Sequence, residues 1–132
     1  MNIKINQAGL DRLQRKLQEM KKKYPAATKQ GMIDTGFAIQ KVAKELVRVD
    51  TGRLRASISV VWKGGNSQVD PGFADIKAIT PPTDEYTVLV GTIVKYAAPQ
   101  EFGTKFMKGK PYLRPAFIQE VKNLLNNIKR RL

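Results

Sequence analysis

Tyr96-Ala97-Ala98-Pro99-Gln100-Glu101-Phe102-Gly103-Thr104 lies between the clearest predicted strand and the last predicted helix of this chain. Lys110-Pro111-Tyr112-Leu113-Arg114-Pro115 follows a few residues later. Loops are normally polar, because their backbone groups need water. These two segments instead carry aromatic side chains and prolines, so we expect them to cover another surface. We expect that surface to belong to a neighbouring copy of the same chain.

The predicted subunit interface takes its residues from these two segments and from the linker between them. Glu101 is the one acid within this apolar stretch, and three roles are open to it. It can pair with Arg114, pair with an arginine of a neighbouring subunit, or face solvent. The predicted interface residues are Tyr96, Pro99, Glu101, Phe102, Gly103, Thr104, Phe106, Pro111, Tyr112, Leu113 and Arg114.

The elements on either side of the loop are predicted from their patterns. Tyr86–Lys95 is rich in β-branched residues with apolar side chains on both alternating faces, which predicts a strand covered on both sides. Gly91 within it suggests a bulge or a close backbone crossing. Pro115 suits a first helical turn. The helix predicted from there to the end buries Ala116, Phe117, Val121, Leu124, Leu125 and Ile128.

Two helices are predicted at the N-terminal end. Apolar residues at spacings of three and four predict a helix over Gln7–Lys23, with Asn6 as its N-cap. Pro25 begins a second helix that extends to about Val47. Gly31 and Gly36 either permit close approach of another backbone or are simply tolerated. The two stripes are Leu10, Leu13, Leu17, Met20 and Tyr24, then Met32, Thr35, Ile39, Val42 and Leu46.

The middle of the chain predicts a short helical turn followed by strands. Asp50 or Thr51 can cap a turn that places Leu54 and Ile58 on one side and directs Arg53 and Arg55 elsewhere. The arginines suit phosphate contact, although a solvated face is the commoner explanation. Strands are predicted over Ile58–Trp62 and Ile76–Thr80, with a turn at Lys63–Ser67.

These elements predict one α+β domain over residues 1–132, with two N-terminal helices, an antiparallel sheet of three to four strands, and a C-terminal helix packed on the sheet. The predicted parts are a helical arm over 1–47, the sheet over 49–95, the interface loop over 96–114 and the C-terminal helix over 115–132.

Charge is unevenly distributed along the sequence. Lys and Arg total 24 against 11 acids, for a net charge of +13. Residues 1–50 contribute +6, residues 51–100 only +1, and residues 101–132 a further +6. The excess therefore lies on the predicted helices and the late loop. Such a charge favours contact with polyanions or acidic protein surfaces, without choosing between them.

The composition leaves little room for catalysis. The chain has no Cys and no His, which excludes thiol chemistry, Cys/His metal sites and an imidazole base. Asp70 with Asp75, or Asp84 with Glu85, could form a carboxylate pair, but acids are common in such turn-rich segments. We predict no catalytic residue, no metal site and no cofactor. No apolar run approaches the length of a membrane span, and no signal peptide is indicated.

Three segments together resemble a known family. They are Val49-Asp50-Thr51-Gly52-Arg53-Leu54-Arg55-Ala56-Ser57-Ile58, then Val90-Gly91-Thr92 through Tyr96-Ala97, then Glu101-Phe102-Gly103-Thr104 through Pro111-Tyr112-Leu113-Arg114-Pro115-Ala116. In order and spacing they are similar to the bacteriophage tail-component family typified by gene product ten of phage HK-ninety-seven. The resemblance extends over about the whole chain, with Lys63–Asp75 matching least. The motif residues are Asp50, Thr51, Gly52, Leu54, Ser57, Gly91 and Thr92.

The resemblance implies a non-enzymatic structural protein of the virion. Proteins of this kind are neck proteins, head–tail joining proteins or tail-completion proteins. The resemblance also implies a ring around the DNA channel, a hexamer or dodecamer, that is assembled in the host cytoplasm and contacts other neck and tail proteins. Nonspecific contact with DNA in the channel, through Arg53 and Arg55, is a further expectation.

Two other classes of function stay open. The first is a sequence-nonspecific nucleic-acid-binding module, in which Arg53, Arg55 and the basic helix ends neutralise phosphates. Against it, no reader motif is present, and aromatic residues are not interleaved with basic ones. The second, a small hydrolase or toxin, depends on unpaired loop acids and is remote.

Overall fold

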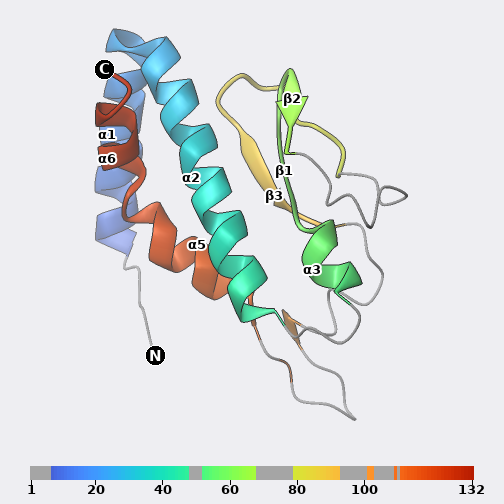
Figure 1. The fold of residues 1–132 in the computed structure, drawn as a ribbon. Helices are drawn as coiled ribbons and strands as arrows, with labels where there is room; N and C mark the ends of the chain where they lie inside the picture. The colour runs from blue at the N-terminus through green and yellow to red at the C-terminus, as the bar shows by residue number, and fades with distance from the viewer. Residues whose placement is uncertain (1–6, 48–51, 68–78, 93–100, 103–108, 110) are drawn as a thin grey trace.

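The computed structural model describes residues 7–47, 52–67, 79–92, 101–102, 109 and 111–132 (Figure 1). It confirms the α+β class, with two N-terminal helices, a small antiparallel sheet and helical structure at the C-terminal end. The elements are α1 (Gln7–Lys23), α2 (Pro25–Leu46), α3 (Arg53–Ser57), β1 (Ser59–Trp62), β2 (Gly65–Asn66), β3 (Val88–Gly91), α5 (Leu113–Val121) and α6 (Leu124–Lys129).

The long helix α2 is the central element of the fold. It lies between the sheet on one side and the helices α5, α6 and α1 on the other (Figure 1). One apolar cluster joins its C-terminal half to α3 and α5, and includes Ile39, Leu54, Ile58 and Tyr112. A second joins its N-terminal half to α1 and α6; its buried members are Met20, Ala27, Leu124 and Ile128, with Leu13 and Leu17 packed against them.

Two glycines let α2 approach its neighbours closely. A Cβ atom at Gly31 would lie 2.6 Å from the Cα atom of Ile128 in α6. A Cβ atom at Gly36 would lie 2.7 Å from a methyl group of Val88 and 2.9 Å from one of Val60 in the sheet. Of the two explanations that the sequence left open, close approach is therefore correct: at Gly31 to the backbone of α6, and at Gly36 to side chains of the sheet.

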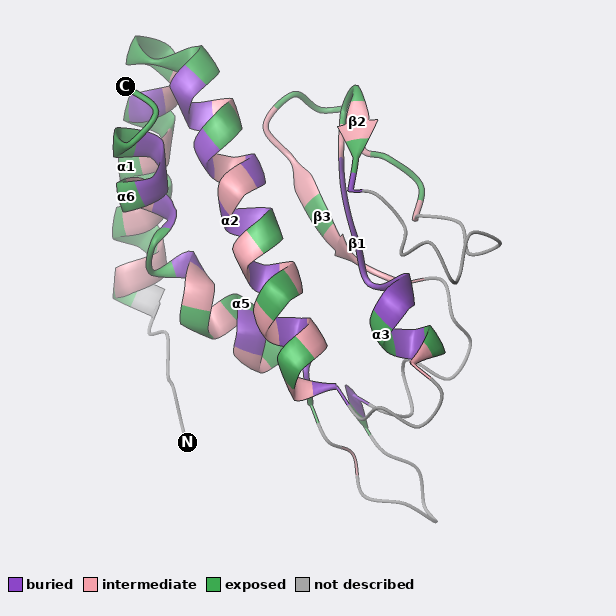
Figure 2. Ribbon diagram, viewed as in Figure 1, coloured by how far each residue is buried: buried purple, intermediate pink, exposed green. Residues whose placement is uncertain are grey.

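The sheet has the strand order β2-β1-β3, and both pairs are antiparallel. Val60 and Val61 of the central strand are fully buried, whereas Leu89 of β3 is 39% exposed (Figure 2). Gly91 pairs in register with Ser59, so neither a bulge nor a crossing is found there. The expected turn after Trp62 is tighter than predicted: Gly64, at φ 98°, reverses the chain directly into β2.

The C-terminal helix differs from the prediction in two ways. It is divided into α5 and α6 by a break at Lys122 and Asn123, where the side-chain amide of Asn123 donates to Glu120. The break lets α5 reach the first apolar cluster and α6 the second. Both helices pack on α2, which lies between them and the sheet, rather than on the sheet directly (Figure 1).

Several predicted helix and strand boundaries differ from those in the structure. The helix α2 begins at Pro25 as predicted, but Tyr24, expected in the α1 stripe, is 44% exposed. Gly52, at φ 78°, is the N-cap of α3 and has no side chain with which to cap it. Ile79 and Thr80 are not in a strand. The predictions for Asn6, Asp50, Thr51, residues 76–78 and residues 93–95 lie outside the described residues.

Candidate subunit-contact surface

Glu101 is held at the N-terminus of α5. Its Oε2 atom accepts the backbone N–H groups of Tyr112 at 2.6 Å and Leu113 at 3.2 Å, and its Oε1 atom accepts that of Arg114 at 2.9 Å. The next residue, Pro115, has no N–H group to satisfy. The backbone N–H groups at the start of α5, which have no partner within the helix, thus all donate to one carboxylate, and the proline position has no N–H group that needs an acceptor.

This arrangement replaces an ordinary N-cap. Tyr112 occupies the N-cap position and makes no side-chain capping bond. Glu101 is only 7% exposed, and its charge lies at the positive end of the helix dipole. Glu101 neither faces solvent nor pairs with the Arg114 guanidinium, since it contacts Arg114 through the backbone. Pairing with an arginine of a neighbouring subunit stays a prediction.

Tyr112 lies in the core of its own subunit. Its side chain is fully buried in the apolar cluster with Ile39, Leu54 and Ile58. Burial, with a further contribution from the Glu101 carboxylate, raises the pKa of the Tyr112 phenol to about 12. The side chain of Tyr112 is therefore not on the surface that a second copy would touch, which differs from the predicted interface.

Phe102, next to the buried Glu101, has the opposite environment. It is 82% exposed. It borders an apolar hollow of about 590 Å³ between α2, β3 and α5, whose walls include Met32, Gly36, Val90 and Phe117. Phe117 is itself 48% exposed, although the stripe pattern predicted it to be buried. The surface formed by Phe102, Phe117 and this hollow is referred to below as the Phe102 surface.

A family model described as "Bacteriophage HK97-gp10, putative tail-component" matches residues 11–103. The chain belongs to this family. The match covers more than half of the chain and extends from α1 to the segment that carries Glu101 and Phe102. No curated protein and no solved structure matches the chain. Membership of the tail-component family supports a structural role in the virion.

The described motif residues of this tail-component protein join α3 to the end of β3. The Ser57 hydroxyl donates to the carbonyl of Leu54 at 2.7 Å and lies 2.5 Å from the Thr92 hydroxyl. Leu54 and Ser57 are buried. Gly52 adopts the left-handed conformation that favours glycine. These motif residues therefore hold the fold together, while Asp50 and Thr51 lie outside the described residues.

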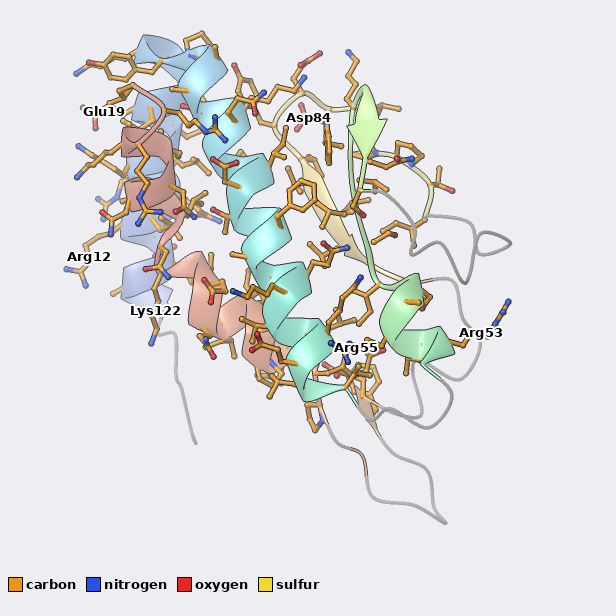
Figure 3. All side chains as sticks on the ribbon, in the orientation of Figure 1. Arg12, Glu19, Arg53, Arg55, Asp84 and Lys122 are labelled. Carbon is orange, nitrogen blue, oxygen red and sulfur yellow. The ribbon has the colours of Figure 1, made fainter. Side chains whose placement is uncertain are left out.

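The remaining predicted interface residues are divided between surface and undescribed segments. Pro111 and Arg114 are exposed, and Leu113 is half-buried against the first apolar cluster. Arg53 and Arg55 are both exposed on α3, as expected (Figure 3). The predicted interface residues outside the described segments are Tyr96, Pro99, Gly103, Thr104 and Phe106.

Polar contacts within the core were not predicted. The Gln40 amide of α2 donates to the carbonyl of Ile58 at 2.8 Å. The buried Asn127 amide of α6 donates to the Thr35 hydroxyl at 2.9 Å, and Thr35 donates to the carbonyl of Gly31 at 2.8 Å. The only sequence signal is a polar residue within or beside an apolar stripe. Such a residue does not disclose which distant group it meets.

The acids considered for catalysis are arranged differently in the tail-component protein. Asp84 accepts a hydrogen bond from Thr87 at 2.9 Å, whereas Glu85 accepts ones from Lys29 and Lys63 at 2.8 and 3.1 Å. Those two lysines lower the pKa of Glu85. Adjacent carboxylates that are directed to different partners do not form an acid–base pair. Asp70 and Asp75 lie outside the described residues.

Metal-binding and membrane-spanning features are both missing from the described part of the chain. Among its residues no group of three or more acidic, His or Cys side chains is placed to hold a metal ion. Within the same ranges, no helix combines the length and apolar character that crossing a membrane requires.

Proposed function

We propose that this tail-component protein is a non-enzymatic structural subunit that assembles with copies of itself into a ring around the DNA channel. The ring would lie at the phage head–tail junction, as a neck or tail-completion layer. The observation that supports this proposal most is the exposure of Phe102 beside an apolar hollow. A hexamer or a dodecamer is the expected size.

The Phe102 surface has the properties of a contact site. Burying a phenylalanine side chain contributes about 2 kcal/mol, and Phe102 forgoes most of this in the isolated subunit, where it is 82% exposed. Phe117 and the apolar hollow extend the same surface. Contiguous exposed apolar surface of this kind commonly marks a protein contact.

Glu101 prepares this surface for binding. Its three hydrogen bonds to the start of α5 fix the backbone immediately before Phe102. A side chain that is held in place before association loses less conformational entropy when a partner covers it. A head-to-tail contact of this kind closes into a ring when its rotation allows.

The test is the size of the assembly formed by Phe102→Asp. We expect this variant to remain folded, because Phe102 is mostly outside the core, and to lose self-association in sedimentation velocity. Leu132→Asp is the matched control, since Leu132 is 61% exposed but lies at the C-terminus, outside the Phe102 surface. Assemblies of unchanged size for folded Phe102→Asp would contradict the proposal, and so would equal losses in both variants.

The net charge of +13 also favours a second candidate, a sequence-nonspecific nucleic-acid-binding module. The two candidates predict different behaviour in solution. A monomer that saturates duplex DNA at physiological salt and forms no ring would favour the second candidate. A ring with or without DNA affinity favours the first.

A further inference from the structure

The positive charge of this protein is concentrated on one layer of the fold. The helix α1 has six basic and two acidic residues, and the segment from Lys122 to Leu132, which includes α6, has four basic and no acidic ones. Together they carry a net +8 of the total +13. The described sheet segments, residues 59–67 and 79–92, carry one lysine and two acids.

These two elements lie in one layer, on the side of α2 away from the sheet (Figure 1). The apolar sides of both elements pack against α2 in the second apolar cluster. Most of their charged side chains are on the outside, whereas the half-buried Lys21 lies over the Tyr86 ring at 4.9 Å. Arg12 of α1 and Lys122, in the break before α6, point away from the core on the same side of the molecule (Figure 3). We refer to this as the α1–α6 basic face.

Most of the charge on this face is not neutralised within the subunit. Glu19 is shared between Lys16 and Lys23 at 3.4 and 3.5 Å, and Arg131 pairs with Asp34 at 2.7 Å. Six further basic residues are exposed and form no salt bridge with any residue that the structure describes. They are Arg12, Arg15, Lys22, Lys122, Lys129 and Arg130. Of these, Arg130 lines a polar hollow with Asp34 and Glu120, so its charge is the most nearly balanced.

The character of the face favours phosphates over an acidic protein surface. Protein interfaces have a core of buried apolar side chains. Of the large exposed apolar residues in the described segments, Tyr24 and Leu132 adjoin this layer at the end where α1 meets α2, while Phe117 of α5 lines the hollow of the Phe102 surface. Protein–DNA interfaces are more polar and strongly positive. The 17 residues of α1 extend over about 25 Å, the length of roughly seven base pairs of duplex.

We propose that the α1–α6 basic face binds the phosphate backbone of duplex DNA without reading its sequence. This inference depends on the proposed function in one respect: the duplex that the face would meet is the DNA in the proposed channel. It also moves the expected phosphate contacts away from Arg53 and Arg55. Arg53 extends from α3 on the opposite side of the molecule from Arg12 (Figure 3).

The experiment compares three charge-matched variants by fluorescence anisotropy with a labelled 30-base-pair duplex over a range of KCl concentrations. Two of them change the face: Arg12→Gln/Arg15→Gln/Lys22→Gln and Lys122→Gln/Lys129→Gln/Arg130→Gln. The control changes three basic residues elsewhere: Lys41→Gln/Arg53→Gln/Arg55→Gln. All three variants lower the net charge from +13 to +10. Circular dichroism and thermal melting confirm that each is folded.

We expect each face variant to weaken binding at least tenfold. The slope of the logarithm of the association constant against the logarithm of the salt concentration is negative, and its magnitude should decrease by about 3, because each phosphate that the protein neutralises contributes about 0.9 to it. The control should bind no worse than about twofold more weakly. Equal weakening in all three variants, or no duplex binding by the wild type, would overturn the proposal. So would polyglutamate that competes as well as DNA at equal charge, because the partner would then be an acidic protein surface.

The same samples separate this proposal from ring assembly. Sedimentation velocity reports self-association, and Phe102→Asp should keep its affinity for the duplex because Phe102 is outside the basic face. Duplex binding through the face without any ring would contradict only the assembly proposal. A ring whose face variants bind DNA like the wild type would contradict only this inference.

Discussion

The Glu101 carboxylate lies 2.6 Å from the backbone nitrogen of Tyr112, and this contact joins the segment that carries Phe102 to the start of α5. The same carboxylate also accepts the N–H groups of Leu113 and Arg114. A single side chain therefore holds residue 101 against the backbone of residues 112–114. It also separates two neighbours with different roles: Glu101 supports the fold, and Phe102 faces outward.

Replacing Glu101 should cost more stability than replacing another acid near the same helix. In Glu101→Gln, one carboxylate oxygen becomes an amide donor that faces backbone N–H groups, so we expect a loss of about 2 kcal/mol in the free energy of unfolding, and about 3 kcal/mol for Glu101→Ala. Urea denaturation measures both. Glu120→Gln is the control, because Glu120 accepts only two long side-chain contacts at 3.3 Å. Similar losses at positions 101 and 120 would contradict the capping role.

Tyr112 should make the stability of the subunit sensitive to alkaline pH. Its pKa is raised to about 12 in the folded state by burial and by Glu101, against about 10 in an unfolded chain. The unfolded state therefore releases the proton first, and the stabilising contribution, complete below pH 10, is lost as pH rises toward 12. Unfolding free energies of the wild type and Tyr112→Phe at several pH values measure this. The wild type should lose stability relative to Tyr112→Phe over that range, and a constant difference would contradict the prediction.

The contact between Ser57 and Thr92 should appear as coupling in a double-mutant cycle. Their hydroxyl oxygens lie 2.5 Å apart and link α3 to the end of β3. Ser57→Ala and Thr92→Val should each cost about 1 kcal/mol in the free energy of unfolding. The double variant should cost clearly less than the two losses combined, because both remove the same bond. Additive losses would mean that the contact contributes nothing of its own.

The sequence predicted the elements with strong local patterns and missed what depends on distant contacts. Regular spacing of apolar residues identified α1 and α2, and Pro25 marked the start of α2 as found. The break at Asn123 could not be seen, because the apolar stripe continues across it from Val121 to Leu124. The break is set by the separate packing of α5 and α6 on α2.

The candidate surface was predicted in part. Composition alone drew attention to the segment around Phe102, and the structure places Phe102 at the surface. Composition could not distinguish an aromatic side chain at the surface from one that fills the core, so Tyr112 was expected at the surface and is found buried. Nor could it show that Glu101 would meet backbone N–H groups eleven residues later, because no periodic pattern encodes that contact.

The glycine notches of α2 have a mechanical consequence. Gly31 is seated on the backbone of α6 and Gly36 on the side chains of Val60 and Val88, so at these two points α2 touches both the helical half and the β half of the subunit directly. A load applied to the outer helices would be transmitted directly to the strands. If the proposed ring around DNA forms, we therefore expect each subunit to deform little under load and any movement to occur at the contacts between subunits.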